Sequence, residues 1–500
     1  LAVGGKRLAL QPYPHERVWI KGSVVVTAWV QDGTMWRHDD WPYRFQQGGL
    51  SSAFIDPAYP LAAYPDMVFV DGKPLKQVAS VAEVTGNTFY VDYTTGRLYI
   101  GADPTKGVVE AAAFAPALNI FNSQGTIIRG LGFLHYATHR NNYGMVKGNA
   151  AKLTFENNTF AWSAAAGLGI LKRDSIVRGN TFMYNGLVGL SASQAHKLHA
   201  ERNTFAYNNY ERFSTSHESG GAKIAQSYHT VWKYNLGAYN FGKALWFDVG
   251  CYNTTVVGNE LRNNDTHGLA MEVSANAIVA SNVFAGHANS KSPALLINES
   301  HDLQVYNNTF TTNHINIGLV EGDRSNTNPV TLDTGQSVTI KQDVEQITIK
   351  NNLLSNTGSG AVTSSLVSVR DWTTNKSAAE MVVAMDSNGY YRTQSTEPAT
   401  AIRWGLGGGQ GDVYYATITR FRRETGHEQR ALVIENQQPN PFFVDEANGD
   451  FRLLPESPAR GYGEALPAAV AAAIGVQADV PVDLGALVSV SYTHLRAHET

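Results

Sequence analysis

Two short phrases of one type, each ending in a carboxylate, are the part of this chain best suited to chemistry. Residues 244–248 read ALWFD and residues 268–272 read GLAME, so Asp248 and Glu272 lie at equivalent positions of the two phrases. Two carboxyl groups held side by side can divide the work of breaking a glycosidic bond, one as proton donor and one as nucleophile or base. The question is therefore whether the fold brings these two residues together.

An asparagine repeat predicts the fold that would do so. Asparagine followed by a Thr-Phe or similar apolar pair recurs about every 23 residues, with longer intervals where loops are inserted, at Asn158, Asn180, Asn203, Asn235, Asn259, Asn282, Asn308 and Asn352. A short fixed period is typical of a solenoid in which one repeat makes one coil. Asparagine suits left-handed turns, and stacked amides can hydrogen-bond as a ladder. We therefore predict an all-β, right-handed parallel β-helix, a pectate-lyase-like solenoid.

Apolar alternation gives the register of the coils. After most of these asparagines comes a strand whose alternate residues are apolar, such as Leu245 with Phe247 and Leu269 with Met271. Those residues should fill the interior, and their neighbours should point outward. Strands of adjacent coils lie about 4.8 Å apart, so the carboxyls of Asp248 and Glu272 should lie about 5 Å apart, close to the spacing of about 5–5.5 Å in retaining glycosidases. Repulsion of about 3 kcal/mol between such charges would keep one of them protonated.

Other outward residues complete the predicted site. Trp246 would offer a flat apolar face to a sugar ring, and Lys223, one coil earlier, would hold a hydroxyl or a carboxylate. A loop over residues 208–220 should overhang the outward face, and such loops often carry function. We also expect substrate contacts from five further residues, namely His217 and Glu218 in that loop, His267, Asn298, and Glu321 two coils beyond Glu272. No metal ligand is expected among them.

Composition excludes several classes of protein. Thirty-nine Lys and Arg against 43 Asp and Glu give a net charge of −4, which argues against nucleic acid as a partner. The single Cys251 leaves no disulfide framework and no multi-cysteine metal site. No apolar run reaches the length of about 18 residues that spans a membrane. We expect an extracellular or periplasmic bacterial protein whose signal peptide is absent from the sequence as given.

The expected organisation has five parts. They are a first coil at 16–30, a small antiparallel β module inserted at 31–107, a β-helix at 108–460 with loop insertions at 208–220 and 322–346, a C-terminal cap at 461–488, and a terminal stretch at 489–500 that resembles translated sequencing-adaptor read-through. The last stretch is excluded from the fold.

The two acid-bearing phrases support a family resemblance. With residues 246–248 (WFD), Asn253, Asn259 and residues 271–274 (MEVS), the chain resembles the bacterial right-handed β-helix glycoside hydrolases, above all glycoside hydrolase family 120 (β-xylosidases), with family 141 as a relative. The resemblance covers residues 110–320 well. It implies that Asp248 is the nucleophile and Glu272 the acid/base, which spacing alone does not decide. The implied activity is that of a retaining, exo-acting glycosidase on plant-type oligosaccharides, without a cofactor.

Two alternatives stay open at this point. A lyase or epimerase acting on uronates would use Lys223 or Arg212 as base, and Asp248 and Glu272 would hold Ca²⁺, a cation that prefers carboxylate oxygens. Against it, the outward column lacks the clustered Arg and Lys that a uronate requires. A non-catalytic carbohydrate-binding β-helix would keep the stacking by Trp246 and would bind sugar without either acid.

Overall fold

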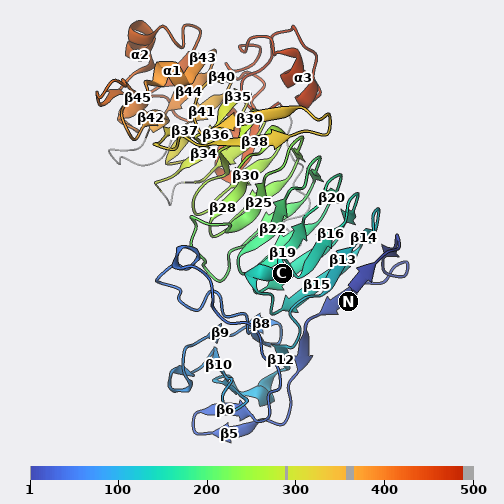
Figure 1. Ribbon diagram of the computed structural model, residues 1–500. Helices are drawn as coiled ribbons and strands as arrows, with labels where there is room; N and C mark the ends of the chain where they lie inside the picture. The colour runs from blue at the N-terminus through green and yellow to red at the C-terminus, as the bar shows by residue number, and fades with distance from the viewer. Residues whose placement is uncertain (1, 288–290, 356–364, 488–500) are drawn as a thin grey trace. The chain divides into compact units, whose positions relative to one another are not determined.

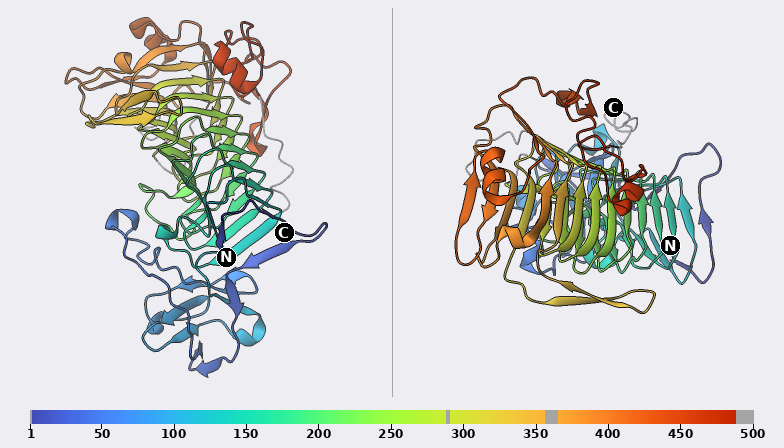
Figure 2. Two further views of the ribbon diagram at one scale, coloured as in Figure 1. Left: turned by 45° about the vertical axis from the view of Figure 1, so that its right-hand side comes forward. Right: turned by 90° about the horizontal axis from the view of Figure 1, so that it is seen from above.

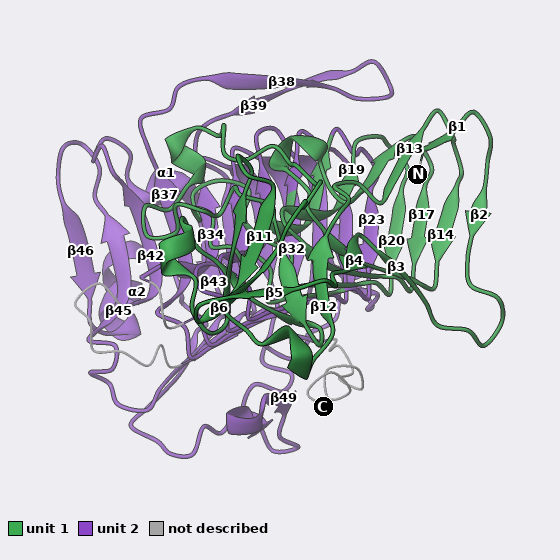
Figure 3. Ribbon diagram, turned by 90° about the horizontal axis from the view of Figure 1, so that it is seen from below, with its two compact units in different colours: residues 1–193, 204–223 green, residues 194–203, 224–500 purple. Residues whose placement is uncertain are grey.

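The computed structural model describes residues 2–287, 291–355 and 365–487. The expected adaptor-derived stretch at 489–500 lies outside these residues. The chain divides into two compact units (Figure 3), unit 1 with residues 1–193 and 204–223 and unit 2 with residues 194–203 and 224–500. Each unit is built of coils with one short strand in each of three parallel sheets, named A, B and C, and the chain runs through them in that order.

Unit 1 contains the early coils. Sheet A has β1 (Ala2–Gly4), β13 (Leu118–Phe121), β16 (Val146–Asn149), β19 (Ala166–Ile170) and β22 (Val188–Ser193). Sheet B has β2 (Ala9–Leu10), β14 (Ile127–Arg129), β17 (Thr154–Glu156) and β20 (Ile176–Arg178). Sheet C has β3 (Val18–Lys21), β15 (Leu131–Tyr136), β18 (Thr159–Ser163), β21 (Thr181–Met183) and β24 (Thr204–Ala206).

The first coil begins earlier than the sequence pattern indicates. Its strands are β1, β2 and β3, which pair in parallel with β13, β14 and β15. Residues 16–30, expected to be this coil, contain only its last strand. The next strand, β4 (Ser23–Val25), pairs antiparallel with β12 (Val109–Ala112) and so belongs to the inserted module. Strands of two to four residues are too short to show a reliable alternation, and this is why the pattern missed β1 and β2.

The module between the first and second coils is antiparallel apart from one short pair. One sheet contains β4, β12, β7 (Val68–Val70) and β8 (Lys73–Pro74). The other contains β5 (Val30–Asp32), β6 (Met35–His38), β11 (Arg97–Ile100), β10 (Thr88–Asp92) and β9 (Lys76–Gln77), the last two being parallel. Trp41, Phe89 and Leu98 lie in its own small core. The insertion is thus a separately packed element within unit 1.

Unit 2 contains the later coils, whose sheet A strands follow one another in Figure 1. Sheet A has β28 (Lys243–Asp248), β31 (Leu269–Glu272), β34 (Pro293–Asn298), β37 (Ile315–Glu321), β42 (Ser365–Asp371), β45 (Thr400–Gly405) and the antiparallel β46 (Asp412–Tyr415). Sheet B has β23 (His199–Glu201), β26 (Val231–Lys233), β29 (Tyr252–Val257), β32 (Ala275–Ala280), β35 (His301–Tyr306), β40 (Ile347–Lys350) and β43 (Val382–Asp386). Sheet C has β27 (Leu236–Ala238), β30 (Glu260–Arg262), β33 (Val283–Ala285), β36 (Thr309–Thr311), β41 (Leu353–Ser355), β44 (Gly389–Arg392) and β47 (Leu432–Glu435).

Elements outside the coils complete the described chain. They are the hairpin β38 (Thr327–Thr331) and β39 (Ser337–Lys341), the pair β48 (Phe443–Asp445) and β49 (Asp450–Leu453), and the helices α1 (Ala378–Met381), α2 (Ile418–Thr425) and α3 (Ala468–Ile474). Strand β25 (Gly220–Ala225) is a further strand of sheet A, and its residues are divided between the two units. Helix α3 packs on Val257, Ala280 and Tyr306 of sheet B, within the stretch expected as a C-terminal cap.

The asparagine ladder is present inside both units. In unit 1, Asn158 Nδ2 donates to Asn180 Oδ1 at 3.0 Å. In unit 2 the same bond links consecutive members of the series Asn203, Asn235, Asn259, Asn282, Asn308, Asn352 and Asn388. The ladder ends where Asn388 donates to the buried carboxylate of Glu428 at 2.7 Å. Each amide also donates to backbone carbonyl groups, so the ladder satisfies buried polar groups at every turn.

Loss of one rung should destabilise unit 2. In Asn282→Ala, the backbone N–H and side-chain amide of Asn259 lose their shared acceptor, and the carbonyls of Val256 and Ala280 lose their donor. Since each buried polar group left unpaired costs about 1–3 kcal/mol, we expect the free energy of unfolding to fall by at least about 3 kcal/mol in urea titrations. Asn263→Gly is the control, because Asn263 is an exposed turn residue with φ 53°, which glycine adopts freely. Equal, small effects of both changes would contradict a stabilising ladder.

Candidate active site

The strand register places the two acids at equivalent positions of neighbouring coils. In the pairing of β28 with β31, Leu245 lies opposite Leu269 and Phe247 opposite Met271, so the next pair is Asp248 with Glu272. The four apolar residues are fully buried in the interior. Because side chains alternate along a strand, both acids are directed to the outer face. The predicted register of the apolar residues is therefore confirmed. Asp248 is only 6% exposed, and the side chain of Glu272 is 16% exposed.

The position of these acids continues along sheet A. Glu272 lies opposite Asn298, Asn298 opposite Val320, and Val320 opposite Arg370. We call these five equivalent positions, from Asp248 to Arg370, the acid column. Each step along the column is one strand spacing, about 4.8 Å. The column therefore crosses five neighbouring strands of unit 2.

Arg324 joins the site from a distant part of the chain. Its Nη2 lies 3.0 Å from Glu272 Oε1, and its Nε lies 2.8 Å from Glu299 Oε2. One guanidinium therefore binds two carboxylates, and it also interacts electrostatically with Asp248. Arg324 is 44% exposed at its side chain, whereas Glu299 is almost fully buried. The arrangement fixes the carboxylate of Glu272 by a charge-assisted contact.

Glu299 lies in the turn that follows β34. The residues directly after the strands have left-handed backbones here, with φ 50° at Val249, 47° at Val273 and 45° at Glu299. Burial raises the pKa of Glu299, the charge of Arg324 opposes this, and the charge of Glu272 adds to it. The site therefore contains a third acid that favours its protonated form more than an exposed glutamate does.

A hairpin passes beside the acids. After Glu321 the chain leaves the coil and forms the hairpin of β38 and β39, which runs along the coils of unit 2, as the right-hand view of Figure 2 shows. At its tip, Asp333 accepts a hydrogen bond from Tyr228 at 2.6 Å and pairs with Lys197 at 2.6 Å. Midway, side-chain atoms of Asn328 and Val330 lie 3.8 Å from the point where a Cβ on Gly250 would be. The segment expected as an insertion at 322–346 thus passes next to the turn after Asp248 and supplies Arg324.

Trp246 does not form the expected exposed platform. It is only 4% exposed, because β28 is buried along its whole length. The ammonium group of Lys243 lies 3.8 Å from the centre of the indole ring. Strand alternation directs Trp246 away from the interior of the coil. A side chain directed outward can still be buried when other side chains cover it, as Lys243 covers the ring of Trp246. Its stacking against a sugar ring in the ligand-free conformation is therefore excluded.

Glu321 is not in the acid column. Val320 occupies the position opposite Asn298, and Glu321 is paired with Asp371 in the next coil. The coil from Asn298 to Val320 is one residue shorter than the assumed period, so the alternation places Glu321 on the opposite side from the prediction. Its carboxylate accepts a hydrogen bond from Val344 N at 2.5 Å, and burial raises its pKa to about 8. Glu321 anchors the base of the hairpin instead of lining a subsite with Glu272.

Two further predicted residues of unit 2, Asn298 and His267, occupy different environments. Asn298 is next to Glu272 in the acid column, as expected. His267 is at the opposite end of β31, where Nδ1 lies 2.7 Å from the carbonyl of Pro293 and burial lowers its pKa to about 3. His267 is therefore neutral and about five residues, or about 17 Å, from Glu272 along the strand.

Three predicted residues belong to unit 1 and are described there. Glu218 forms a two-pronged pair with Arg140, with both N–O distances 2.8 Å, and His217 packs on Phe54 with ring centres 4.7 Å apart. Lys223 is part of β25. The loop that carries Glu218 is thus held in place within unit 1, and the contribution of these residues to the site stays a prediction.

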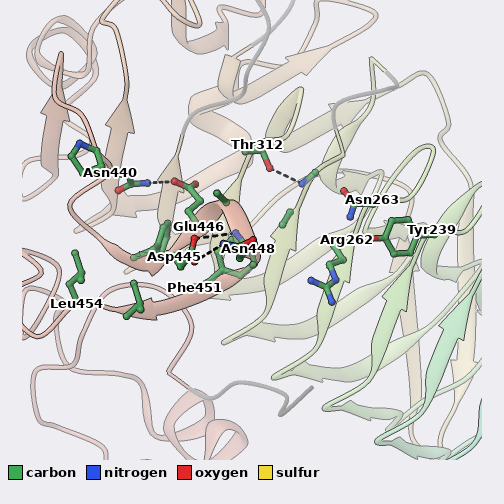
Figure 4. A pocket seen from close by; sticks show the side chains of 17 residues that line it. Tyr239, Arg262, Asn263, Thr312, Asn440, Asp445, Glu446, Asn448, Phe451 and Leu454 are labelled. Carbon is green, nitrogen blue, oxygen red and sulfur yellow. Dashed lines mark hydrogen bonds between the residues drawn. The ribbon is translucent and has the colours of Figure 1, made fainter. Parts of the chain in front are cut away.

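A hollow in unit 2 contains none of the predicted residues. A cavity of about 880 Å³ lies between the turns after the sheet C strands and residues 439–454 (Figure 4). Its acids are engaged locally, since Glu446 accepts from Asn440 at 2.8 Å and Asp445 from Asn448 at 2.7 Å. The acid column begins at the other end of the sheet A strands, so the cavity and the acids are separate features.

Two further findings concern metal-ligating side chains and helix length. Within the described ranges, no group of three or more His, Cys, Asp or Glu side chains is placed to hold a metal ion. None of the helices in the described part of the chain has the length and apolar character to span a bilayer.

Comparison with known proteins establishes the fold. A family model described as right handed beta helix region matches residues 117–235 and 147–310. The structure of XylC with xylose resembles this chain with a TM-score of 0.61 and 14% identity, covering 87% of this chain and 77% of that one. A periplasmic alginate epimerase, AlgG (TM-score 0.38, 11% identity, 55% and 63% covered), and a glycoside hydrolase (0.37, 10%, 78% and 83%) are more distant. No curated protein matches the sequence. The chain is a right-handed parallel β-helix, as the asparagine repeat predicted.

Proposed function

We propose that this protein is a retaining glycoside hydrolase acting on plant-type oligosaccharides of the xylo-oligosaccharide kind. Asp248 is the nucleophile and Glu272 the acid/base, the roles that the resemblance to family 120 gives them. The observation that carries the proposal is the strand register, which sets the two acids one strand spacing apart on the outer face of unit 2. That spacing of about 4.8 Å suits the carboxyl separation of about 5–5.5 Å used by retaining enzymes.

Each residue has a defined part in the reaction. Asp248 attacks the anomeric carbon while protonated Glu272 gives its proton to the leaving oxygen, and a covalent glycosyl ester forms. Glu272, now a carboxylate, takes a proton from water, which attacks the ester and releases Asp248. The cation of Arg324 stabilises the carboxylate of Glu272 in this second step.

The stereochemistry of the first product tests the proposal. We expect a screen of para-nitrophenyl glycosides to find turnover on the β-xyloside, with proton NMR showing the β-anomer of xylose before mutarotation. The α-anomer as first product would mean inversion, which the spacing of Asp248 and Glu272 does not support. No turnover on any glycoside of the screen would contradict hydrolysis itself.

Replacement of Arg324 should lower turnover. In Arg324→Ala, Glu272 loses the guanidinium 3.0 Å from its carboxylate that fixes its position, so we expect kcat on para-nitrophenyl β-xyloside to fall by about 10- to 100-fold. Arg420→Ala is the control, because Arg420 makes a comparable ion pair with Glu424 at 3.0 Å in helix α2. A parental kcat in folded Arg324→Ala, with only lower thermal stability, would leave Arg324 a purely structural role.

A lyase or epimerase acting on uronates is the second candidate, and Arg324 is the observation that favours it. The sequence pattern showed no cluster of Arg and Lys in the outward column to neutralise a uronate carboxylate, and Arg324 now adds a cation next to Glu272. Against it, Arg324 is already shared by two carboxylates. A rise in ultraviolet absorbance from unsaturated products on alginate or polygalacturonate, with and without added Ca²⁺, would favour the lyase over the hydrolase.

A further inference from the structure

An exposed indole lies on the same edge of sheet A as the acid column. Trp372 follows Arg370 by two residues and is 64% exposed. Its backbone N–H donates to the carbonyl of Glu321 at 3.0 Å, so it is attached directly to the preceding coil. A large apolar ring left in water is costly, and surfaces that bind other molecules are enriched in tryptophan. The platform expected at Trp246 is thus absent there, whereas Trp372 has the exposure that Trp246 lacks.

The turn that carries Trp372 is rigid. The buried carboxylate of Asp371 accepts hydrogen bonds from the backbone N–H groups of Thr373 at 2.6 Å, Asn375 at 3.0 Å and Lys376 at 2.7 Å. It also accepts one from the hydroxyl of Thr373 at 2.7 Å. Residues on both sides of the indole are therefore fixed before any ligand arrives, and this reduces the entropic cost of binding.

Arg370 supports the ring from one side. Its guanidinium carbon lies 3.6 Å from the centre of the indole ring, within the range of a cation–π contact. This contact holds the ring in one orientation and leaves the rest of its surface to solvent. A planar apolar face with a fixed orientation suits the C–H face of a pyranose ring, while Arg370 can donate hydrogen bonds to neighbouring hydroxyl groups.

The position of Trp372 matches an extended ligand. Arg370 is three steps beyond Glu272 in the acid column, with Asn298 and Val320 between them. Three strand spacings amount to about 14 Å, longer than a single pyranose ring. A monosaccharide at Asp248 and Glu272 cannot reach the indole, whereas an oligosaccharide lying along the column can.

We propose that Trp372, supported by Arg370, is a distal subsite for a neutral oligosaccharide whose other end is held at Asp248 and Glu272. The inference rests on the proposed function for the position of the scissile bond. It adds the substrate class, because a subsite at this distance selects chains over disaccharides and aryl glycosides.

Steady-state kinetics of Trp372→Ala test the subsite. With xylohexaose and para-nitrophenyl β-xyloside as the two substrates, the ratio of their KM values should rise about tenfold, equivalent to about 1.4 kcal/mol. The kcat on xylohexaose should stay within about twofold, because the change is remote from the reacting atoms. Trp372→Phe should restore most of the affinity. An unchanged KM ratio would overturn the proposal.

Calorimetry separates failure of the subsite from failure of the proposed function. In Asp248→Ala, which binds without turnover, we expect Trp372→Ala to weaken xylohexaose binding about tenfold. Tyr239→Ala is the matched control, since Tyr239 is an exposed aromatic residue at the separate cavity. If the parent hydrolyses no glycoside but xylohexaose binding depends on Trp372, the subsite stands without the hydrolase. If xylohexaose does not bind, or binds equally with and without Trp372, the subsite is wrong.

Discussion

Asp248→Ala should lose turnover of every glycoside while keeping the fold. Without the carboxylate, no covalent intermediate forms, and loss of a nucleophile lowers kcat by about three to six orders of magnitude. Added azide should restore part of the activity, because the small anion fits the space left by the side chain and attacks the anomeric carbon. Since azide comes from the enzyme's nucleophilic face and is not then displaced, the product should be a glycosyl azide of inverted configuration, detectable by NMR.

The control for this variant is Asp302→Asn. Asp302 is half-exposed, pairs with His301 at 2.6 Å and lies on β35 of sheet B in unit 2, outside the acid column. It should retain the parental kcat, and both variants should show the parental circular dichroism and urea midpoint. Near-normal activity of folded Asp248→Ala would show that the reaction does not use this residue.

Glu272→Ala should have an effect that depends on the leaving group. On substrates with poor leaving groups, such as xylobiose, loss of the general acid should lower kcat/KM by about 10² to 10⁴. On a dinitrophenyl xyloside, whose leaving group needs no proton, the first step should proceed at nearly the parental rate. Azide should then accelerate the second step and give a glycosyl azide of retained configuration, opposite to the product of Asp248→Ala.

Two other variants, Glu345→Ala and Glu299→Ala, are the controls that show whether the leaving-group dependence belongs to Glu272 alone. Glu345 follows β39, is partly exposed and pairs with Lys341 at 2.7 Å, so Glu345→Ala should behave as the parent on both substrates. Glu299 shares Arg324 with Glu272 and should change the pH profile without the leaving-group dependence. If Glu299→Ala instead showed that dependence and Glu272→Ala did not, the acid/base would be Glu299.

The fold was readable from the sequence because its two signals repeat. Each rung of the asparagine ladder reports the same local requirement, a polar side chain that satisfies buried backbone groups at a turn, so Asn235, Asn259 and Asn282 support one another as evidence. The apolar pairs Leu245 with Phe247 and Leu269 with Met271 then fix the register. Where a signal occurs only once or a strand is very short, as in β1 and β2, the prediction was wrong about the boundary.

The errors at the site have two physical causes. Glu321 was assigned to the wrong face because a coil shortened by one residue reverses the alternation, and the sequence does not reveal where a residue is lost. Trp246 was taken as exposed because alternation predicts direction only, and burial depends on what packs outside the coil. Both errors arise where a local pattern was extended beyond the information it contains.

Arg324 and Glu299 could not be found from the repeat alone. Arg324 is 52 residues from Glu272 and reaches it only because the hairpin returns along the coils. The sequence gives only a weak indication that Glu299 belongs to the site, because Glu299 directly follows Asn298 of the outward column. Its role depends on the contact with Arg324, which it shares with Glu272. Contacts of this kind are set by tertiary structure, and a single sequence gives no account of them.

Trapping of the covalent intermediate tests the central claim most directly. Incubation with a 2-deoxy-2-fluoro-xyloside that carries a dinitrophenyl leaving group slows the second step, and peptide mapping by mass spectrometry then locates the sugar. The register of β28 and β31 predicts a single label on Asp248. A label on Glu272, Glu299 or any other residue, or inactivation without a covalent adduct, would contradict the account.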